Sequence, residues 1–365
     1  MSNRVFNFSA GPSTLPLSVL ETAAAELTCF RDTGVSILEL GHRTECFKAI
    51  TKQATDRVRQ ILKVPDNYDV FFVQGGGRLI FSVLCMNFCT PEQQGQYLVT
   101  GSWGKAALAE AQKSGQGHCI WNGKASGYST IPTPAELQLG PNPAFLHYTS
   151  NETIEGVQFP YDLKANWDGG VPVICDVSSD FMSHEIDIAN YDMIYACIQK
   201  NLGPAGATLV VAKRDLLEQA PECLPGYLRL ANHAAADSMM NTPPVFCIYI
   251  ANLVLEWFQK EYGDLATIGK FNEAKSALVY RTLQEFPDVY QLHAAATCRS
   301  RMNVTFRLPN DQLEQEFLEQ AEQRNLYYLA GHRSVGGIRA SLYNAMPMEG
   351  AQALADFIRA FAIDR

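Results

Sequence analysis

The sequence predicts an α/β protein with a mostly parallel β-sheet in its larger part and a smaller α+β domain after it. Short apolar runs at Asp69–Val73, Gln96–Thr100 and Phe145–Tyr148 are typical of buried strands, and helical patterns separate them. Strands that alternate with helices favour a parallel sheet. A long helix ends near Gly263, and from Leu265 the pattern changes to helix, strand, helix, strand, helix, which indicates a domain change.

Two helices are expected before the first strand. Pro16 suits the first turn of a helix, and apolar residues recur after it at helical spacing. A second apolar series, from Phe47 to Ile61, predicts another helix, which Pro65 ends. Between the two lies the dipeptide His42-Arg43, and two such side chains are by themselves typical of a solvated loop.

A glycine-rich turn follows the strand Asp69–Val73. It comprises residues 74–78, with Gly77 and Arg78 at its end, and an apolar helix then runs to Phe88. This order of strand, glycine turn and helix aims free backbone N–H groups at an anion, and glycine lets the anion approach closely. The spacing is not that of a dinucleotide-binding motif or a P-loop, and many glycine runs are plain turns.

Polar and aromatic residues follow the next two strands. Gly101-Ser102-Trp103 opens a helix after Gln96–Thr100, and a tryptophan there either packs in the core or offers a flat face to a ring. A polar loop that ends at Thr153 follows Phe145–Tyr148. Ligands of parallel sheets collect at the carboxyl ends of the strands. The residues expected just past such ends are Gly77, Trp103, Thr153, Asp176 and Lys200.

Asp176 and Lys200 are the two candidates with specific chemistry. Val171–Ile174 predicts a short buried strand before Asp176, and Met193–Ile198 predicts another that leads into Lys200. Partial burial favours the uncharged, nucleophilic amine of a lysine. Pyridoxal phosphate needs a lysine that bonds its aldehyde and a carboxylate that keeps its ring nitrogen protonated. On these two residues alone, a surface lysine beside a structural aspartate is the favoured alternative.

The C-terminal third contains a second cationic loop. Residues 331–339 place His332, Arg333 and Arg339 among glycines ahead of the strand expected at Ile338–Tyr343. The planar guanidinium of arginine matches a carboxylate or a phosphate. The dipeptides His42-Arg43 and His332-Arg333 are far apart in the sequence, and together they would suit a dianionic substrate.

The composition is that of an ordinary globular protein. The chain has 365 residues, 47% of them hydrophobic, which is enough for about two domains. A net charge of −9 argues against a nucleic-acid surface, and no apolar run approaches the roughly 20 residues of a membrane helix. The 10 cysteines form no CxxC pair, as expected of free thiols in a reducing compartment. We expect a cytoplasmic protein without a signal peptide, a metal, or a nucleic-acid or membrane partner.

Several motifs resemble the phosphoserine aminotransferases, which belong to the class V branch of the fold-type I pyridoxal-phosphate enzymes. YACIQKNLGPAG around Lys200, with DVSSDFMS before it, resembles the cofactor-lysine region of that family. NFSAGPSTLP and GHRSVGGIRASLYNAM extend the resemblance over nearly the whole chain. It implies a large domain at residues 16–263, with a mostly parallel seven-stranded sheet flanked by helices, and a smaller α+β domain formed by residues 1–15 and 264–365.

The resemblance also implies a role for each residue of a pyridoxal phosphate site. Lys200 would bond the cofactor, Asp176 would pair with the ring nitrogen, and Trp103 would stack on the ring; these three are the implied catalytic residues. Thr153 would hydrogen-bond the phenolic oxygen of the ring. The residues implied to hold the cofactor phosphate are Gly77, Arg78 and Gln199, joined by Asn241 and Thr242 of a partner chain. A site shared in this way implies a homodimer.

Small-molecule substrates and a reaction are implied as well. Arg339 would bind the α-carboxylate, and Ser9 would touch the amino-acid substrate. The two His-Arg dipeptides, one of them from the other chain, would bind the phosphate of phosphoserine or the distal carboxylate of glutamate. The reaction would be reversible amino transfer between L-glutamate and 3-phosphohydroxypyruvate, giving O-phospho-L-serine and 2-oxoglutarate. A second implied substrate is 3-hydroxy-2-oxo-4-phosphonooxybutanoate, which bacterial members use in pyridoxine synthesis.

Two alternatives stay open at this point. Another class V enzyme is the nearer one, although a cysteine desulfurase would need a mobile cysteine late in the chain and usually a histidine before the lysine. Here Gln199 precedes Lys200, and the last cysteine is Cys298. A non-catalytic binding protein on the same fold is the other alternative, and the presence of Lys200 with Asp176 argues against it.

Overall fold

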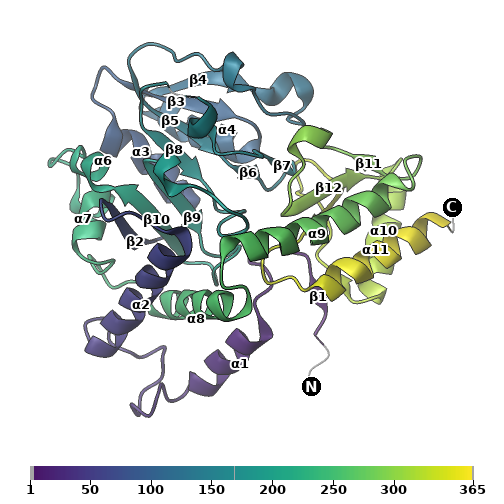
Figure 1. Cartoon of the computed structure of the whole chain (residues 1–365), viewed down its shortest axis with the longest axis horizontal. Coiled ribbons are helices and arrows are strands. Elements are labelled where there is room, and N and C mark those ends of the chain that lie inside the picture. Colours follow the sequence, from purple (N-terminus) through teal and green to yellow (C-terminus); the bar gives the residue numbers. More distant parts are fainter. Residues whose placement is uncertain (1–3, 168, 364–365) are drawn as a thin grey trace.

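A seven-stranded sheet forms the centre of the larger part of the molecule (Figure 1). This is a computed structural model, and it describes residues 4–167 and 169–363. The strands stand in the order β2-β10-β9-β8-β5-β3-β4, and β10 alone runs antiparallel to its neighbours. The strands are β2 (Tyr68–Gln74), β3 (Gln94–Val99), β4 (Gly117–Asn122), β5 (Pro143–Thr149), β8 (Val173–Asp176), β9 (Met193–Cys197) and β10 (Ala207–Lys213).

Both faces of this sheet are covered by helices. Those that follow a strand or pack on the sheet are α2 (Glu45–Leu62), α3 (Gly77–Phe88), α4 (Ser102–Lys113), α6 (Arg214–Glu218), α7 (Leu230–Ala235) and α8 (Val245–Glu261). Two more, α1 (Leu17–Glu26) and the short α5 (Leu163–Asn166), lie outside this layer. The predicted mostly parallel α/β sheet is therefore confirmed.

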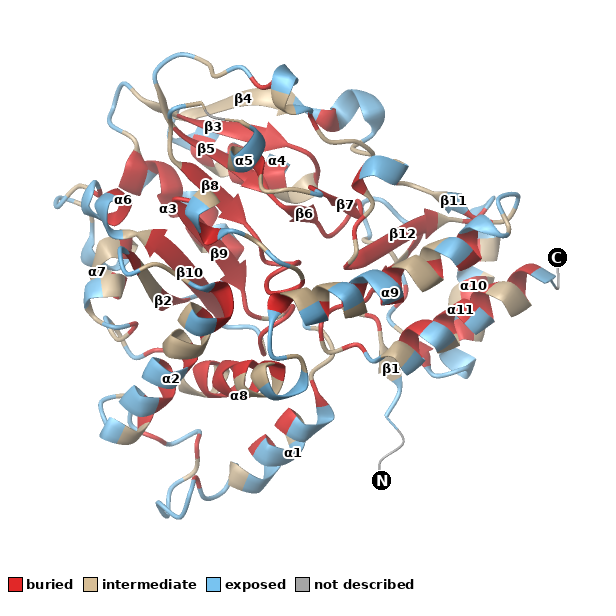
Figure 2. Ribbon diagram, in the orientation of Figure 1, coloured by how far each residue is buried: buried red, intermediate tan, exposed pale blue. Residues whose placement is uncertain are grey.

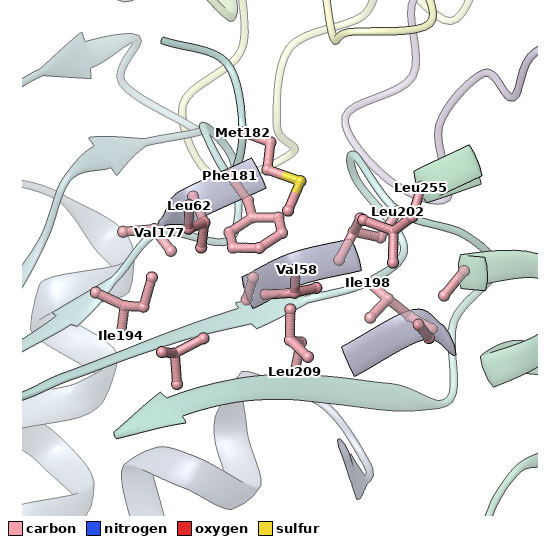
Figure 3. Close-up of a cluster of buried hydrophobic side chains, with 14 of the residues drawn as sticks. Val58, Leu62, Val177, Phe181, Met182, Ile194, Ile198, Leu202, Leu209 and Leu255 are labelled. Atoms are coloured by element: carbon pink, nitrogen blue, oxygen red, sulfur yellow. The ribbon is translucent and has the colours of Figure 1, made fainter. Parts of the chain in front are cut away.

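Alternation along the strands explains why both faces are apolar. Successive side chains of a strand point to opposite faces. Val173 packs in the same core as α2 and α8, whereas its neighbour Ile174 packs in the core formed with α3 and α4. Figure 2 shows that the central strands are buried throughout, and Figure 3 shows Ile194 and Leu209 of the sheet among the side chains of the first core.

A second body of α+β structure follows α8. Its sheet has the order β11-β12-β14 and is antiparallel. Its elements are β11 (Gln291–Leu292), β12 (Asn303–Arg307), β14 (Ile338–Ser341), α9 (Leu265–Gln284), α10 (Asp311–Gln323) and α11 (Met348–Ile363). Near the N-terminus β1 (Phe6–Asn7) pairs with β13 (Leu326–Tyr327), so the start of the chain lies against this body. The exact division into domains stays a prediction.

Two features differ from what the sequence predicts. The edge strand β4 was not expected, because its residues are only half buried and carry no continuous apolar run. The helix α8 begins at Val245 with Pro244 as its N-cap, and neither Asn241 nor Thr242 caps it, although asparagine and threonine are residue types that favour the N-cap. Two consecutive prolines delay the helix start, because a residue before proline is biased away from helical backbone angles.

Among the described residues, no helix combines the length and apolar character needed to cross a membrane.

Lys275 of α9 holds the chain segment that follows β14. Its side chain is fully buried, and its Nζ donates hydrogen bonds to the carbonyl oxygens of Leu342 at 3.1 Å, Tyr343 at 2.8 Å and Met346 at 3.0 Å. An ammonium has three donors, and all three are used here. Asn344, which follows Tyr343 in this segment, contacts the larger body. Its backbone N–H donates a hydrogen bond to Asn201 Oδ1 at 3.0 Å.

We predict that Lys275→Met lowers the free energy of unfolding by at least about 3 kcal/mol, because three buried carbonyls lose a charged donor. Urea unfolding followed by circular dichroism measures this. Lys270→Met, at an exposed position of the same helix, is the matched control and is expected to change stability by about 0.5 kcal/mol or less. Equal stability of the two variants would contradict the role given to Lys275.

Candidate active site

Four strands of the central sheet, β2, β3, β8 and β9, end around one cavity of about 350 Å³. β2 leads into the first turn of α3, β3 into the first turn of α4, and β8 and β9 end beside each other. The cavity is lined by Gly76, Gly77, Arg78, Phe81, Trp103, Asp176, Ser178, Cys197, Gln199 and Lys200. The predicted residues Gly77, Trp103, Asp176 and Lys200 are thus brought together as their positions after strands require.

Lys200 lies just beyond β9 with its side chain buried. Its Nζ donates a hydrogen bond to Thr153 Oγ1 at 2.7 Å and lies 5.4 Å from the centroid of the Trp103 ring. Gly11 has a φ of +133°, and a Cβ there would come within 3.3 Å of Lys200 Cγ. The amine is therefore held at the cavity by a hydroxyl on one side and by close packing of the N-terminal segment on the other.

Asp176 is the last residue of β8 and its carboxyl group is buried. Oδ1 accepts a hydrogen bond from the backbone N–H of Ser178 at 2.9 Å. Burial raises the pKa of Asp176, and the charge of Lys200 and the hydrogen bonds from Ser178 oppose that shift. A cation placed against this carboxyl group would oppose the effect of burial further, because an opposite charge favours the ionised form.

Trp103 is the second residue of α4, and two buried carboxylates hold the start of that helix. Glu152 accepts hydrogen bonds from the backbone N–H groups of Trp103 at 2.9 Å and Gly104 at 2.8 Å. Glu155 accepts from Ser102 N at 3.0 Å and from Ser102 Oγ at 2.6 Å. These N–H groups have no partner within a helix, and negative charge is favoured at a helix N-terminus. These bonds therefore fix the backbone that carries the indole.

The start of α3 forms the opposite wall of the cavity. Gly77 is its first residue, and its backbone N–H points to Cys197 Sγ at 2.8 Å. A Cβ at Gly77 would lie 3.1 Å from that sulfur, so the small residue is required by the close approach of β9. Arg78 is exposed at the rim, and Gln199 is half buried beside Lys200. A helix N-terminus with an arginine at its rim fits an anionic group.

Arg339 lies on β14 at the edge of a separate, smaller cavity of about 30 Å³. This second cavity also contains Ile154, the residue after Thr153, so the two cavities are neighbours. Arg339 Nε is buried and has no hydrogen-bond partner within the described residues. Burial lowers the pKa of Arg339, although the guanidinium stays charged because its ordinary pKa is above 12. A buried guanidinium with a free donor can bind a carboxylate.

The two His-Arg dipeptides are placed differently. His332 lies in the loop before β14. Burial and the charges of Arg339 and Arg333 lower the pKa of His332. Arg333 is exposed. His42 and Arg43 lie in the loop before α2 and line neither cavity of this chain. Neither dipeptide lines a cavity of the single chain, and only His332-Arg333 lies in the loop that leads into β14 and Arg339.

Three more predicted residues lie outside the cavity of Lys200. Ser9 belongs to the N-terminal segment that packs on Lys200, and its Oγ accepts from Gly11 N at 3.4 Å. Asn241 donates from Nδ2 to Gln74 Oε1 at 2.7 Å, and Thr242 is exposed. The contact of Asn241 and Thr242 with the cofactor phosphate bound by a partner chain stays a prediction, as does the contact of Ser9 with the amino-acid substrate.

Sequence reasoning missed several residues of the site. Glu152 and Glu155 lie in the segment between β5 and β8, with Glu152 in the short strand β6 (Asn151–Glu152), and nothing in their spacing distinguishes a buried helix-capping carboxylate from a solvated one. Cys197 falls within the strand predicted at Met193–Ile198, and the structure places its side chain at the cavity wall. His293 lines the smaller cavity with Arg339, and its Nε2 is buried without a hydrogen-bond partner among the described residues.

These residues fit pyridoxal phosphate. The cavity presents an amine from Lys200 and a buried carboxyl from Asp176 on adjacent strands, with the face of Trp103 beside them. The start of α3 offers a place for a phosphate, and the half-buried Trp103 leaves its Nε1 without a partner among the described residues. The donor set of amine, carboxylate, aromatic face and helix N-terminus is the one that the cofactor requires.

Comparison with known proteins agrees with this reading of the fold. The family model of class V aminotransferases matches residues 5–354, and the chain therefore belongs to the class V aminotransferases. A phosphoserine aminotransferase of Laribacter hongkongensis is 45% identical over 358 residues, covering 98% of each chain. One of Rhodopirellula baltica is 44% identical, covering 98% of this chain and 95% of the relative. Within its class, the chain is a member of the phosphoserine aminotransferase family.

Solved structures give the same result. The phosphoserine aminotransferase of Bacillus circulans subsp. alkalophilus superimposes with a TM-score of 0.96 and 42% identity, covering 100% of both chains. The pyridoxal-phosphate-bound phosphoserine aminotransferase of Trichomonas vaginalis gives a TM-score of 0.90 with 35% identity, covering 98% of this chain and 100% of the other. The predicted fold class is thereby confirmed over the whole chain.

Proposed function

We propose that the protein is a pyridoxal-phosphate-dependent phosphoserine aminotransferase. It transfers the amino group between L-glutamate and 3-phosphohydroxypyruvate, giving O-phospho-L-serine and 2-oxoglutarate in serine biosynthesis. The observation that carries the proposal is the meeting of Lys200 and Asp176 at the ends of adjacent parallel strands, around one cavity with Trp103. The names of relatives above 40% identity over nearly the full chain support the substrate.

Lys200 is the residue that handles the proton. When bound, pyridoxal phosphate supplies an aldehyde that bonds amines and a ring that accepts the electrons released from Cα of the substrate. Lys200 holds the cofactor until the amino donor takes its place. With the cofactor bound, the Lys200 amine would take the proton from Cα of the amino donor as a base and would give it up to C4′ of the cofactor as an acid. Thr153 Oγ1, 2.7 Å from Nζ, orients this amine.

The other residues of the cavity set the charge and position of the cofactor ring. Asp176, ionised against the ring nitrogen, keeps that nitrogen protonated during the proton transfer. Trp103 offers its face to the ring and excludes water from one side. Gly77, Arg78 and Gln199 bind the phosphate at the start of α3.

A homodimer completes the site. In this proposal Asn241 and Thr242 reach the cofactor phosphate of the partner chain. His42 and Arg43 line neither cavity of their own chain, and a second chain would bring such a dipeptide to the other active site. The dimer explains why one chain carries two cationic dipeptides of which only His332-Arg333 adjoins Arg339.

The substrate groups have separate partners. Arg339 binds the α-carboxylate, and Ser9 on the N-terminal segment touches the amino acid. The two His-Arg dipeptides bind the phosphate of phosphoserine or the distal carboxylate of glutamate, since both are anions at the same end of the substrate. The same pocket would accept 3-hydroxy-2-oxo-4-phosphonooxybutanoate, giving 4-phosphohydroxy-L-threonine for pyridoxine biosynthesis. The proposed location is the cytoplasm.

The structure offers no support for a cysteine desulfurase. Cys298, the last cysteine of the sequence, is buried, and its Sγ donates to the carbonyl oxygen of Ser129 at 3.4 Å. A nucleophilic cysteine of that kind needs to be mobile and near the cofactor, and Cys298 lines neither described cavity of the site.

A panel of amino donors tests the proposal. We predict turnover with phosphoserine and glutamate that exceeds turnover with serine, alanine and cysteine by at least about 100-fold, since only the first two carry a second anionic group. Lys200→Ala is expected to abolish turnover and the visible absorbance of the bound cofactor. Lys105→Ala, at an exposed position of α4, is the matched control. Serine or cysteine as the best donor would overturn the assignment.

The two ends of the substrate pocket are predicted to separate by mutation. Arg339→Ala should lower kcat/KM for both phosphoserine and glutamate, because both carry the α-carboxylate. The expected loss of transition-state stabilisation is about 2–4 kcal/mol. His332→Ala combined with Arg333→Ala should harm phosphoserine more than glutamate. Arg281→Ala, at an exposed position of α9, should change neither. If kcat/KM of the double variant falls by the same factor for phosphoserine and glutamate, the pocket does not select for phosphate.

A further inference from the structure

The turn from Glu152 to Val157 touches both halves of the proposed active site. On one side its two carboxylates hold the first turn of α4, which carries Trp103. On the other side it docks onto β12, the strand that pairs with β14, and Thr305 of β12 stands directly opposite Arg339 of β14. This turn therefore lies between the ring-stacking residue and the carboxylate-binding arginine of the proposed function.

Glu155 makes contact in both directions at once. Its side-chain Oε1 accepts from the N–H and the hydroxyl of Ser102, at 3.0 and 2.6 Å. Its backbone carbonyl accepts from Thr305 Oγ1 at 2.8 Å. The next residue, Gly156, accepts at its carbonyl from Ser300 N at 2.9 Å. Three hydrogen bonds at a single residue thus connect α4 to β12.

The glycines of this region show how closely the parts approach. A Cβ at Gly101 would lie 2.5 Å from Glu155 Oε2, and a Cβ at Gly104 would lie 3.1 Å from Glu152 Oε1. On the other side Gly156 has a φ of +70°, and a Cβ there would meet the Asn303 carbonyl at 2.6 Å. Such contacts leave no room for the turn to shift by itself.

Capping of α4 uses both side-chain oxygens of Glu152 but only one of the two oxygens of Glu155. Both oxygens of Glu152 accept backbone N–H groups of the helix, whereas Glu155 Oε2 is buried without a hydrogen-bond partner among the described residues. Burying a second carboxylate is costly. Burial raises the pKa of Glu155, and the charge of Glu155 in turn favours the charged form of Arg339. The link to the second body is made by the backbone carbonyl of Glu155, while the side chain of the same residue is bonded to Ser102 of α4.

We propose that Glu155 is a positioning residue that ties the first turn of α4 to the strand pair β12–β14, so that Trp103 and Arg339 are held at a fixed separation. The inference rests on the proposed function for the roles of Trp103 and Arg339. It has a direct consequence: loosening the link at either end changes the behaviour of the residue at the other end.

Crossed readouts test the link. Thr305→Val removes the bond to the Glu155 carbonyl on the Arg339 side, and it is expected to raise the Kd of pyridoxal phosphate about fivefold and to increase acrylamide quenching of Trp103 fluorescence. Ser102→Ala removes a bond on the Trp103 side, and it is expected to raise the KM for glutamate by a similar factor. The signal of Trp103 among the four tryptophans is isolated by subtraction of Trp103→Phe.

Matched variants separate the link from other effects. Glu155→Gln keeps an acceptor for Ser102 and can place its NH₂ where Oε2 has no partner, so it is expected to stay within about twofold of wild type. Glu155→Ala removes the side-chain contact and is expected to show both defects. Thr282→Val controls for the loss of a hydroxyl group in the second body. Thr282 is a buried residue of α9, and its Oγ1 donates to Leu278 O at 2.9 Å.

One pattern of results would overturn the link. It is refuted if Thr305→Val leaves cofactor affinity and Trp103 quenching equal to those of Thr282→Val, or if Ser102→Ala leaves the KM for glutamate unchanged. Trp103 quenching is measured on the protein without cofactor or substrate. If the wild-type protein does not turn over phosphoserine, the proposed function is contradicted. The quenching measurement still tests the link in that case, because it needs neither cofactor nor substrate.

Discussion

The site depends on burying an amine and a carboxyl group at the ends of two adjacent strands. Transfer of either charged group from water to a protein interior is costly, and the mutual attraction of opposite charges offsets part of that cost. The sheet makes the arrangement available, because parallel strands end at the same edge. Asp176 ends β8, Lys200 follows β9, and the two strands are paired in the sheet. The apolar cores on both faces fix that edge.

Neighbouring groups then prepare these two residues for chemistry. Thr153 orients the Lys200 amine, and Ser178 hydrogen-bonds the Asp176 carboxylate. Burial alone would favour a neutral Asp176, so the carboxylate is most stable when a positive ring nitrogen lies against it. In the proposed function, a protonated ring nitrogen and the Asp176 carboxylate would stabilise each other's charged form. The second body supplies Arg339 from its own sheet and meets this edge through the turn that contains Glu155.

Much of this arrangement follows from the sequence. Apolar runs predict β2, β3, β5, β8 and β9. The predicted residues just past β2, β3, β8 and β9 meet at one cavity, and Thr153, which follows β5, accepts a hydrogen bond from Lys200. Three features could not be predicted for physical reasons. The half-buried β4 carries no apolar run, and two prolines move the start of α8 to Val245. The burial of Glu152 and Glu155 depends on contacts with a helix some 50 positions earlier in the chain, which no local pattern records.

The most direct test of the central claim is to locate the covalent bond to the cofactor. The protein is incubated with pyridoxal phosphate and reduced with borohydride, and its peptides are analysed by mass spectrometry. The account predicts a stoichiometric pyridoxyl group on the peptide that contains Lys200. A label at another lysine, with Lys200 unmodified, would contradict it.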